Sequence, residues 1–301
     1  LPPPPPDFVV ERVDVDTVPQ PDLIVDPTPD KAKDIDVDFK PDVPVVSTPD
    51  ITSFKDIPPD VGTKPDNNVG AEPENDEKRW AQAVDQTRSP RVLVGILGGR
   101  SKAGRDTALS KIKNGSVTEA AVLKALRWLK AHQNEDGSWG PEKIADTGLA
   151  LLTFLAHGET PGEQEFGPTV ERGIKFLLEI QKKDGLLSAN AYSHGIATYA
   201  LCESYALTGI ISVRDASEKA LQIIIDGQCD RGGYDYGYKK TDRWDMSVSG
   251  WQFQAMKAGK LAGLSNTQLD SAIFKMLRFL REWTFTGQGW GYSGSNSSSI
   301  K

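Results

Sequence analysis

A unit of nearly constant length recurs through the last 185 residues of this 301-residue chain. In each copy a glutamine is followed four residues later by a glycine and six residues later by a large apolar side chain. The copies begin at Gln133, Gln181 and Gln228, which are 48 and 47 residues apart. Self-similarity at this period is typical of repeat architectures, in which each unit buries its apolar face only against its neighbours. The sequence therefore predicts an array of helical units.

Each glutamine closes a stretch with the periodicity of an amphipathic helix. Apolar residues fall at i, i+3, i+4 and i+7 in 122–129 and 170–177, and again in 217–224 with one polar exception. A fourth copy emerges when 275–280 is aligned with 124–129. In that alignment Thr284 replaces the glutamine.

Nearly uncharged segments lie between these amphipathic helices, at 147–156, 195–202 and 246–256. Each is apolar around most of its circumference, which predicts a helix that is buried on both sides. The amphipathic helices would then be outer and the uncharged helices inner. Glycines typical of helix ends follow the inner segments, at Gly158, Gly209 and Gly263. Seven main helices are predicted, which would leave a closed ring of six pairs unfinished.

Residues 1–79 have a different composition from the rest. They hold 16 of the 20 prolines, and their 19 acidic and 8 basic residues give a net charge of −11. With only three aromatic residues, the segment cannot bury enough apolar surface to offset the entropy of ordering. We interpret 1–79 as a disordered acidic proline-rich tether, and an interaction tail for a basic partner is the alternative.

Residues 80–116 form a connector rich in glycine and basic residues, with a short helix predicted over 105–113. Gly99 and Gly104 have the spacing of a phosphate-binding loop, but Arg105-Asp106 stands where lysine and then serine or threonine are needed. A flexible connector is therefore the favoured interpretation. The repeat domain occupies 117–301.

The sequence contains no run of 18 apolar residues and no visible signal peptide. Because the first residue is Leu1, we expect a fragment or processed form, whose missing N-terminal part would be the place for a membrane attachment. Cys202 and Cys229 form neither a disulfide framework nor a metal-binding set. Both are expected to be packing residues.

The repeats resemble the QW repeats of the terpenoid cyclase and protein prenyltransferase superfamily, which includes squalene-hopene cyclase-like proteins. The pattern Lys124-Ala125-x3-Leu129-x3-Gln133-x3-Gly137-x-Trp139 carries the resemblance. A second copy ends at Gln181 and Gly185, and a weaker third has Tyr234 in place of the tryptophan. The resemblance spans about 117–292 and implies an all-α fold, an α/α toroid of helix pairs with an incomplete ring.

In this family the glutamine caps a helix and stacks on the tryptophan, so the repeated residues are expected to stabilise the fold. The expected structural staples are Gln133, Trp139, Gln181, Gln228, Tyr234 and Trp290.

The resemblance also suggests where reactive groups would lie, because substrates of such toroids enter the centre and meet the ends of the inner helices. Asp146 and His194 each lie 13 residues after their glutamine, and Asp245 lies 17 after its own. These three are the candidate catalytic residues. Ordinary helix capping is the alternative for both aspartates.

Class II cyclases protonate an alkene with an Asp-x-Asp-Asp-Thr-Ala motif. The nearest match is 242–247, which has Trp244 at the central acid and Met246 at the threonine. An intact acid motif is therefore not expected, and Asp245 with a raised pKa is the remaining candidate for a general acid.

Protein prenyltransferases hold zinc with aspartate, cysteine and histidine. Asp146, His194 and Asp245 would supply two carboxylates and one imidazole, which are ligand types that suit zinc. Their spacing follows the repeats rather than a metal-ligand motif. We therefore expect no cofactor, with zinc as the alternative.

Aromatic residues on or beside the inner segments are candidates for lining an apolar cavity, with core packing as the alternative. The candidate ligand-binding residues are Tyr199, Trp244, Trp251 and Phe253. The charges of 117–292 are mixed in sign, and no basic aromatic stripe suggests nucleic-acid binding.

Three functions are consistent with these patterns. The first is a toroid that binds an apolar or extended ligand, such as an isoprenoid or a lipid, without cyclase chemistry. The second is an enzyme acting on isoprenoids or lipids with Asp245 as its acid, and the third is a structural module that binds a protein partner. Relatives with such tethers resemble bacterial envelope proteins, which suggests an extracytoplasmic location.

Overall fold

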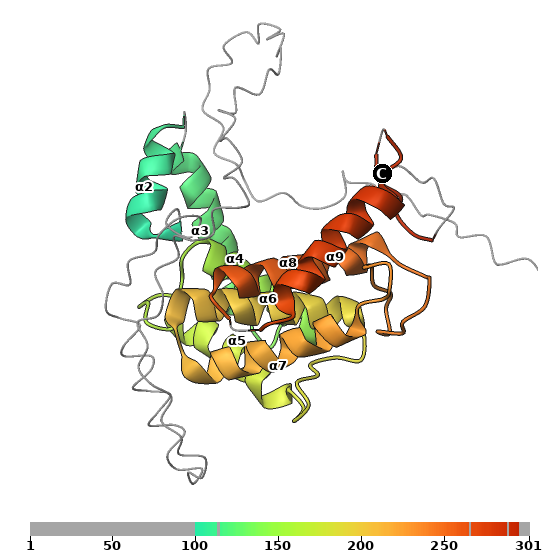
Figure 1. The fold of residues 1–301 in the computed structure, drawn as a ribbon. Coiled ribbons are helices and arrows are strands. Elements are labelled where there is room, and N and C mark those ends of the chain that lie inside the picture. Colours follow the sequence, from blue (N-terminus) through green and yellow to red (C-terminus); the bar gives the residue numbers. More distant parts are fainter. Residues whose placement is uncertain (1–99, 113–114, 265, 288, 295–301) are drawn as a thin grey trace, which may run out of the picture. The chain divides into compact units, whose positions relative to one another are not determined.

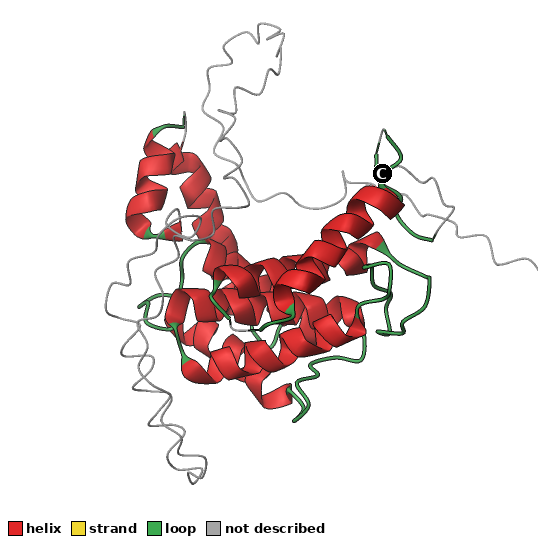
Figure 2. Cartoon of the chain, viewed as in Figure 1, coloured by secondary structure: helices red, strands yellow, loops and turns green. Residues whose placement is uncertain are grey.

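A computed structural model describes residues 100–112, 115–264, 266–287 and 289–294. These residues form helices joined by loops, without a strand among them (Figure 2). The helices are α2 (Lys102–Ser110), α3 (Gly115–Ala131), α4 (Lys143–Ala156), α5 (Gly167–Ile180), α6 (Ala191–Thr208), α7 (Ile211–Gly227), α8 (Met246–Leu261) and α9 (Leu269–Phe279), which continues into the π-helix η4 (Leu280–Thr284). The all-α prediction is confirmed, and α3 to α9 are the seven main helices that were predicted.

From α4 to α8 the helices alternate between an inner and an outer layer, as the sequence predicts. In Figure 1, α4, α6 and α8 lie above α5 and α7, and α6 packs between its two inner neighbours. Close approach of these inner helices depends on small residues. A Cβ atom added to Gly148 of α4, for example, would lie 2.8 Å from Cγ2 of Ile196 in α6.

The apolar core follows the predicted periodicity. The outer helix α5 buries Val170, Ile174 and Leu177 against the inner layer. Helix α9 buries Met276 and Phe279 in a second apolar cluster with α7 and α8. Each outer helix thus turns one face to the inner layer and the other to solvent, which is the arrangement expected of an amphipathic helix.

The inner helices end at the glycines that were predicted to follow them. Gly158, Gly209 and Gly263 follow α4, α6 and α8 and have φ angles of 87°, 70° and 74°. Glycine adopts these left-handed angles without the steric cost that a Cβ atom would add. The three predicted helix ends are therefore confirmed.

The proposed domain boundaries fall mostly beyond what the structure describes. The tether assigned to 1–79 and most of the connector 80–116 lie outside the described residues. Within the connector, α2 starts at Lys102 and so begins three residues before the predicted helix over 105–113. Among the described helices, none is both long enough and apolar enough to cross a lipid bilayer.

Candidate functional site

The repeated glutamine joins each turn to the next outer helix. The Nε2 amide of Gln133 donates to the carbonyls of Gly137, at 2.9 Å, and Thr169, at 3.0 Å. Gln181 donates in the same way to Gly185 and Ala216, and Gln228 donates to Gly232 and Ala272. Each side chain therefore ties its own turn to the helix of the following repeat.

The repeated glycine is required by both its conformation and its contacts. Gly137, Gly185 and Gly232 have φ angles of 85°, 96° and 107°. A Cβ atom at Gly185 would lie 2.6 Å from the carbonyl oxygen of Lys219 in α7. Only glycine allows the turn to approach the next helix this closely.

The residue two positions after the glycine is anchored by a side chain from an inner helix. The backbone N–H of Trp139 donates to Oγ1 of Thr147 at 3.0 Å, and that of Tyr234 donates to Oγ of Ser249 at 3.0 Å. In the second repeat the N–H of Leu187 donates to Nδ1 of His194 at 3.2 Å. The structurally equivalent acceptors are therefore Thr147, His194 and Ser249, one for each repeat.

Both ring nitrogens of His194 are occupied by hydrogen bonds. Since the N–H of Leu187 donates to Nδ1, Nε2 carries the proton and donates to the carbonyl of Ala220 at 3.1 Å. The side chain is fully buried, and this burial lowers its pKa to about 4. His194 is thus a neutral residue that joins the turn after α5 to α7.

The titration of His194 predicts that the protein loses stability in acid. In the unfolded chain the imidazole takes up a proton near pH 6.5, whereas in the fold it does so only near pH 4. The contribution of the neutral ring is complete above pH 6.5 and is lost as the pH falls toward 4, where the loss reaches about 3 kcal/mol. Urea unfolding at pH 7, 5.5 and 4.5 should show this fall in the free energy of unfolding.

The control is a His194→Thr variant, which copies Thr147. It should be less stable at pH 7, but its free energy of unfolding should change less between pH 7 and 4.5. An equal slope in both proteins would contradict this role.

The two candidate aspartates act as helix caps. Asp245 is buried at the N-cap of α8, where Oδ1 accepts from the N–H groups of Ser247, at 2.9 Å, and Val248, at 3.2 Å. Asp146 lies in the first turn of α4, where Oδ2 accepts from the N–H of Glu142 at 2.9 Å. Such contacts satisfy free N–H groups at helix N-termini.

The structure does not gather the three catalytic candidates into a metal site. No cluster of three or more His, Cys, Asp or Glu side chains suited to a metal ion occurs in the part of the chain that the structure describes. The repeat register also separates Asp146 from His194, because Thr147 is the equivalent of His194. Catalytic roles for Asp146, His194 and Asp245 remain predictions.

The aromatic candidates occupy different environments. Trp244 is 2% exposed and contacts the ring of Phe279, with centroids 5.2 Å apart, so it belongs to the core. Phe253 is half-buried and packs against the same core cluster. Trp290 is 55% exposed and pairs with Phe285, whereas its expected counterpart Trp139 is 4% exposed. The fourth turn therefore differs from the first three.

Helix geometry brings the remaining aromatic residues to one side of the inner layer. The side chains that accept from the repeat turns are Thr147, His194 and Ser249, so one side of each inner helix faces these turns. A residue two positions away lies about 160° around the helix from that side. We call the opposite side the inner face. Its accessible apolar members are Leu149 of α4, Tyr192 and Tyr199 of α6, and Trp251 of α8, whereas Ile196, two positions after His194, is fully buried against α4.

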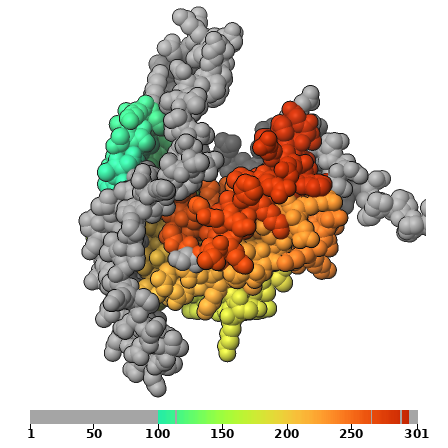
Figure 3. All heavy atoms as spheres, in the orientation of Figure 1, coloured from blue at the N-terminus to red at the C-terminus, as the bar shows by residue number. Residues whose placement is uncertain are grey.

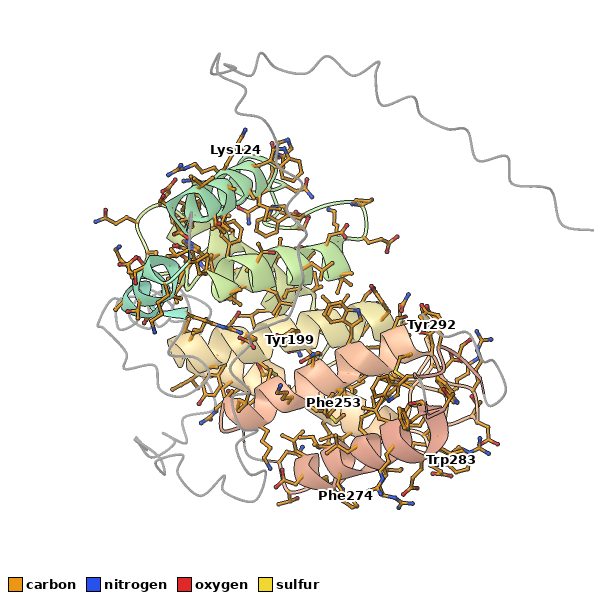
Figure 4. All side chains as sticks on the ribbon, turned by 90° about the horizontal axis from the view of Figure 1, so that it is seen from above. Lys124, Tyr199, Phe253, Phe274, Trp283 and Tyr292 are labelled. Atoms are coloured by element: carbon orange, nitrogen blue, oxygen red, sulfur yellow. The ribbon has the colours of Figure 1, made fainter. Side chains whose placement is uncertain are left out.

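The members of the inner face are accessible, and two of them are in contact. Leu149 is 40% exposed, and the tyrosines and Trp251 are half-buried. The rings of Tyr192 and Trp251 meet edge to face with centroids 6.2 Å apart, which joins α6 to α8. Figure 4 views the layer from above and labels Tyr199 on α6. The inner face thus carries accessible apolar side chains from three helices, with one recorded ring contact between α6 and α8.

Sequence reasoning missed the charged member of this face. Glu203 lies four residues after Tyr199 and therefore one helical turn along the same side of α6. Its carboxylate is buried and pairs with the guanidinium of Arg100, which precedes α2. A buried carboxylate within an otherwise uncharged inner helix was the available signal.

Another charged cluster lies at the end of α4, where it joins α4 to α3. The ring of His157 contacts Glu159 through Nδ1 at 2.7 Å and Glu119 through Nε2 at 3.0 Å. Burial raises the pKa of the Glu159 carboxyl. Arg105 completes the cluster through Glu119 at 3.7 Å.

A surface groove of about 410 Å³ lies beside α9, outside the inner layer. Figure 3 shows α9 in red on the surface of the helical unit. The guanidinium of Arg231 stacks over Trp283 in this groove at 4.3 Å, and Arg231 also pairs with Asp242. The groove is lined by Asp230, Arg231, Ser271, Phe274, Lys275, Arg278 and Trp283.

Comparison with known proteins shows that part of this chain is similar to squalene–hopene cyclases. Residues 104–198 match the squalene-hopene cyclase C-terminal domain family. The squalene–hopene cyclase of Zymomonas mobilis is 34% identical over 91 residues, which cover 25% of this chain and 13% of that enzyme. The corresponding protein of Bradyrhizobium diazoefficiens is 31% identical over 88 residues, covering 24% of this chain and 13% of the relative. The match thus supports the predicted superfamily and spans only a small part of each relative.

Proposed function

We propose that this terpenoid cyclase-like repeat domain binds an apolar, extended molecule on its inner face and does not cyclise it. The observation that carries the proposal is the contrast between two sets of side chains. Leu149, Tyr192, Tyr199 and Trp251 remain accessible, whereas the polar candidates His194 and Asp245 are held in structural hydrogen bonds. Accessible aromatic and aliphatic surface is typical of sites for apolar ligands.

The chemical class of the ligand follows from the surface and from the relatives. Three helices contribute to the inner face, so an elongated molecule would contact more of it than a compact one. The two relatives are named as squalene–hopene cyclases. A linear isoprenoid is therefore the first ligand to test, and a lipid chain is the second.

Substitutions on the inner face should weaken isoprenoid binding. We expect Tyr199→Asp and Trp251→Ala each to raise the dissociation constant for geranylgeraniol by at least about tenfold, because each removes apolar contact area. Equilibrium dialysis with radiolabelled geranylgeraniol measures the change. Phe274→Ala in the groove beside α9 is the matched control and should bind as the unmodified chain does. If only the Phe274→Ala control binds geranylgeraniol more weakly, the binding site is the groove beside α9 and not the inner face.

The competing enzyme hypothesis has its own test. If Asp245 protonates an isoprenoid, Asp245→Asn should abolish turnover of an alkene substrate while it preserves binding to the inner face. We expect no turnover in either protein, measured by mass spectrometry of extracted products after incubation with squalene. If the unmodified chain turns over squalene and Asp245→Asn abolishes that turnover, the protein is an enzyme, and the proposal of binding without chemistry is wrong.

A further inference from the structure

Each outer helix after α3 receives the turn of the repeat before it. The repeated glutamines donate to the carbonyls of Thr169 in α5, Ala216 in α7 and Ala272 in α9. The carbonyls that face the repeated glycines lie three residues further on, at Arg172, Lys219 and Lys275. The side of an outer helix that carries these positions is therefore covered in three successive repeats.

Helix α3 carries the same positions, but here they are exposed. In the alignment of the repeats, Ala121 matches the first set of carbonyls and Lys124 the second. Trp128 matches Phe176 and Phe279, which are 7% and 0% exposed, yet Trp128 itself is 58% exposed. We call this side of α3 the receiving surface, and its exposed residues are Ala121, Lys124, Ala125 and Trp128.

The fourth turn, which follows η4, shows the other half of this contact. Trp290 is 55% exposed, whereas the residues at its position in the first three turns are 4%, 5% and 1% exposed, at Trp139, Leu187 and Tyr234. Gly287 has a left-handed φ angle of 88°, but apart from its chain neighbours no described atom lies within 4 Å of the position of its Cβ. Within the described part of the chain, no outer helix covers this turn as the other three are covered.

The receiving surface and the fourth turn are the two halves of one repeat contact, and both carry exposed aromatic rings. Trp128 stacks on His132 with centroids 4.0 Å apart, and Trp290 pairs with Phe285 at 5.3 Å. Exposed apolar clusters of this kind are typical of interaction sites. Figures 1 and 4 place α3 and the end of α9 on opposite sides of the helical unit, so a single copy of the chain does not bring them together.

We propose that the fourth turn of one copy packs on the receiving surface of a second copy, so that the repeat array continues from one molecule into the next. Trp290 then takes the place beside Ala125 that Trp139 holds beside the equivalent Gly173, where an added Cβ atom would lie 2.9 Å from the indole. Because Thr284 stands in place of the glutamine, no amide ties this contact, and its stability comes from apolar burial. The association is therefore expected to be reversible.

The contact joins unlike surfaces, which distinguishes it from a symmetric dimer. In a pair of copies, one receiving surface and one fourth turn remain unused, so further copies add head to tail. Open chains or a closed ring form according to the angle between successive copies. The inner face takes no part in this contact, so the association and isoprenoid binding are tested independently.

Sedimentation equilibrium of the full chain between about 1 and 100 μM measures the association. The average mass should rise with concentration above the 32.8 kDa of one copy. Trp128→Asp and Trp290→Asp should each raise the dissociation constant by at least about tenfold, because each places a charge in an apolar contact. Phe274→Asp adds the same charge at an exposed aromatic residue elsewhere and is the matched control. A monomer at every concentration, or a control that is weakened equally, would overturn the proposal.

Mixing the two variants tests whether unlike surfaces meet. Trp128→Asp retains the fourth turn and Trp290→Asp retains the receiving surface, so their mixture contains one intact pair of surfaces. Heterodimers should form in the mixture, growth should stop at two copies, and neither variant should associate with itself. A mixture that remains monomeric would contradict the head-to-tail contact, and circular dichroism shows that each variant keeps its helices.

Cross-linking between copies tests the same contact without changing either tryptophan. Ala125→Cys and Thr286→Cys are made in separate copies, and a bis-maleimide is added to the mixture and to each variant alone. The mixture should give at least about ten times more dimer, because the contact raises the effective concentration of the two unlike thiols. The native cysteines are buried, and the unmodified chain measures their background. Equal yields from the mixture and from either variant alone would refute the arrangement.

Discussion

Replacing Gly185 by alanine is expected to lower the free energy of unfolding by at least about 3 kcal/mol, because two costs coincide there. The φ angle of 96° is unfavourable for any residue with a Cβ atom. That atom would also lie 2.6 Å from the carbonyl of Lys219, which is backbone and cannot move without shifting α7. The measurement is urea-induced unfolding monitored by circular dichroism.

Gly263→Ala separates these two costs. Gly263 has a similar φ angle of 74°, but apart from its chain neighbours no described atom lies within 4 Å of the position of its Cβ. It should therefore lose only about 1 to 2 kcal/mol, the cost of the left-handed conformation alone. Equal losses in the two variants would show that the contact between the turn and α7 does not stabilise the repeat.

Removing the amide of Gln228 is expected to have the second largest effect. Its side chain is buried and donates to the carbonyls of Gly232 and Ala272, both at 3.0 Å. Gln228→Ala loses both hydrogen bonds and leaves a cavity, so the free energy of unfolding should fall by about 2 to 4 kcal/mol. Urea unfolding measures the loss, and Gln254→Ala on the exposed side of α8 is the control.

Gln228→Glu tests whether the donors, rather than the size of the side chain, are responsible. Glutamate has nearly the same shape, but its carboxylate would face two carbonyl oxygens that it cannot bond. The variant should be at least as unstable as Gln228→Ala at pH 7 and should recover part of its stability toward pH 5, when the carboxyl is protonated. Stability equal to that of the unmodified chain at pH 7 would rule out the donor role.

The fold could be predicted from sequence because its determinants are local and repeated. Gln133, Gln181 and Gln228 mark the ends of outer helices, and the structure shows each bonding its own turn and the next repeat. Glycines at fixed offsets mark turns that only glycine can form. Signals of this kind recur at the same spacing, so they could be recognised without knowledge of tertiary contacts.

The candidate site was harder to predict because it depends on which side of a helix each residue lies. Trp244 and Trp251 are both aromatic and close in sequence, yet one is in the core and the other on the inner face. Counting from the repeated glutamines aligns His194 with Asp146, whereas in the structure the equivalent of His194 is Thr147. The first and second repeats therefore differ by one residue in this loop. The partner of Glu203 could not be found from local sequence because Arg100 is 103 residues away.

Photolabelling with a linear isoprenoid alcohol that carries a diazirine tests the central claim most directly. After irradiation and proteolysis, mass spectrometry identifies the labelled residues. The proposed function predicts labels on α6 and α8 around Tyr199 and Trp251, and competition by unlabelled geranylgeraniol. Labels confined to α9 around Phe274 and Trp283, or no labelling that geranylgeraniol suppresses, would contradict binding at the inner face.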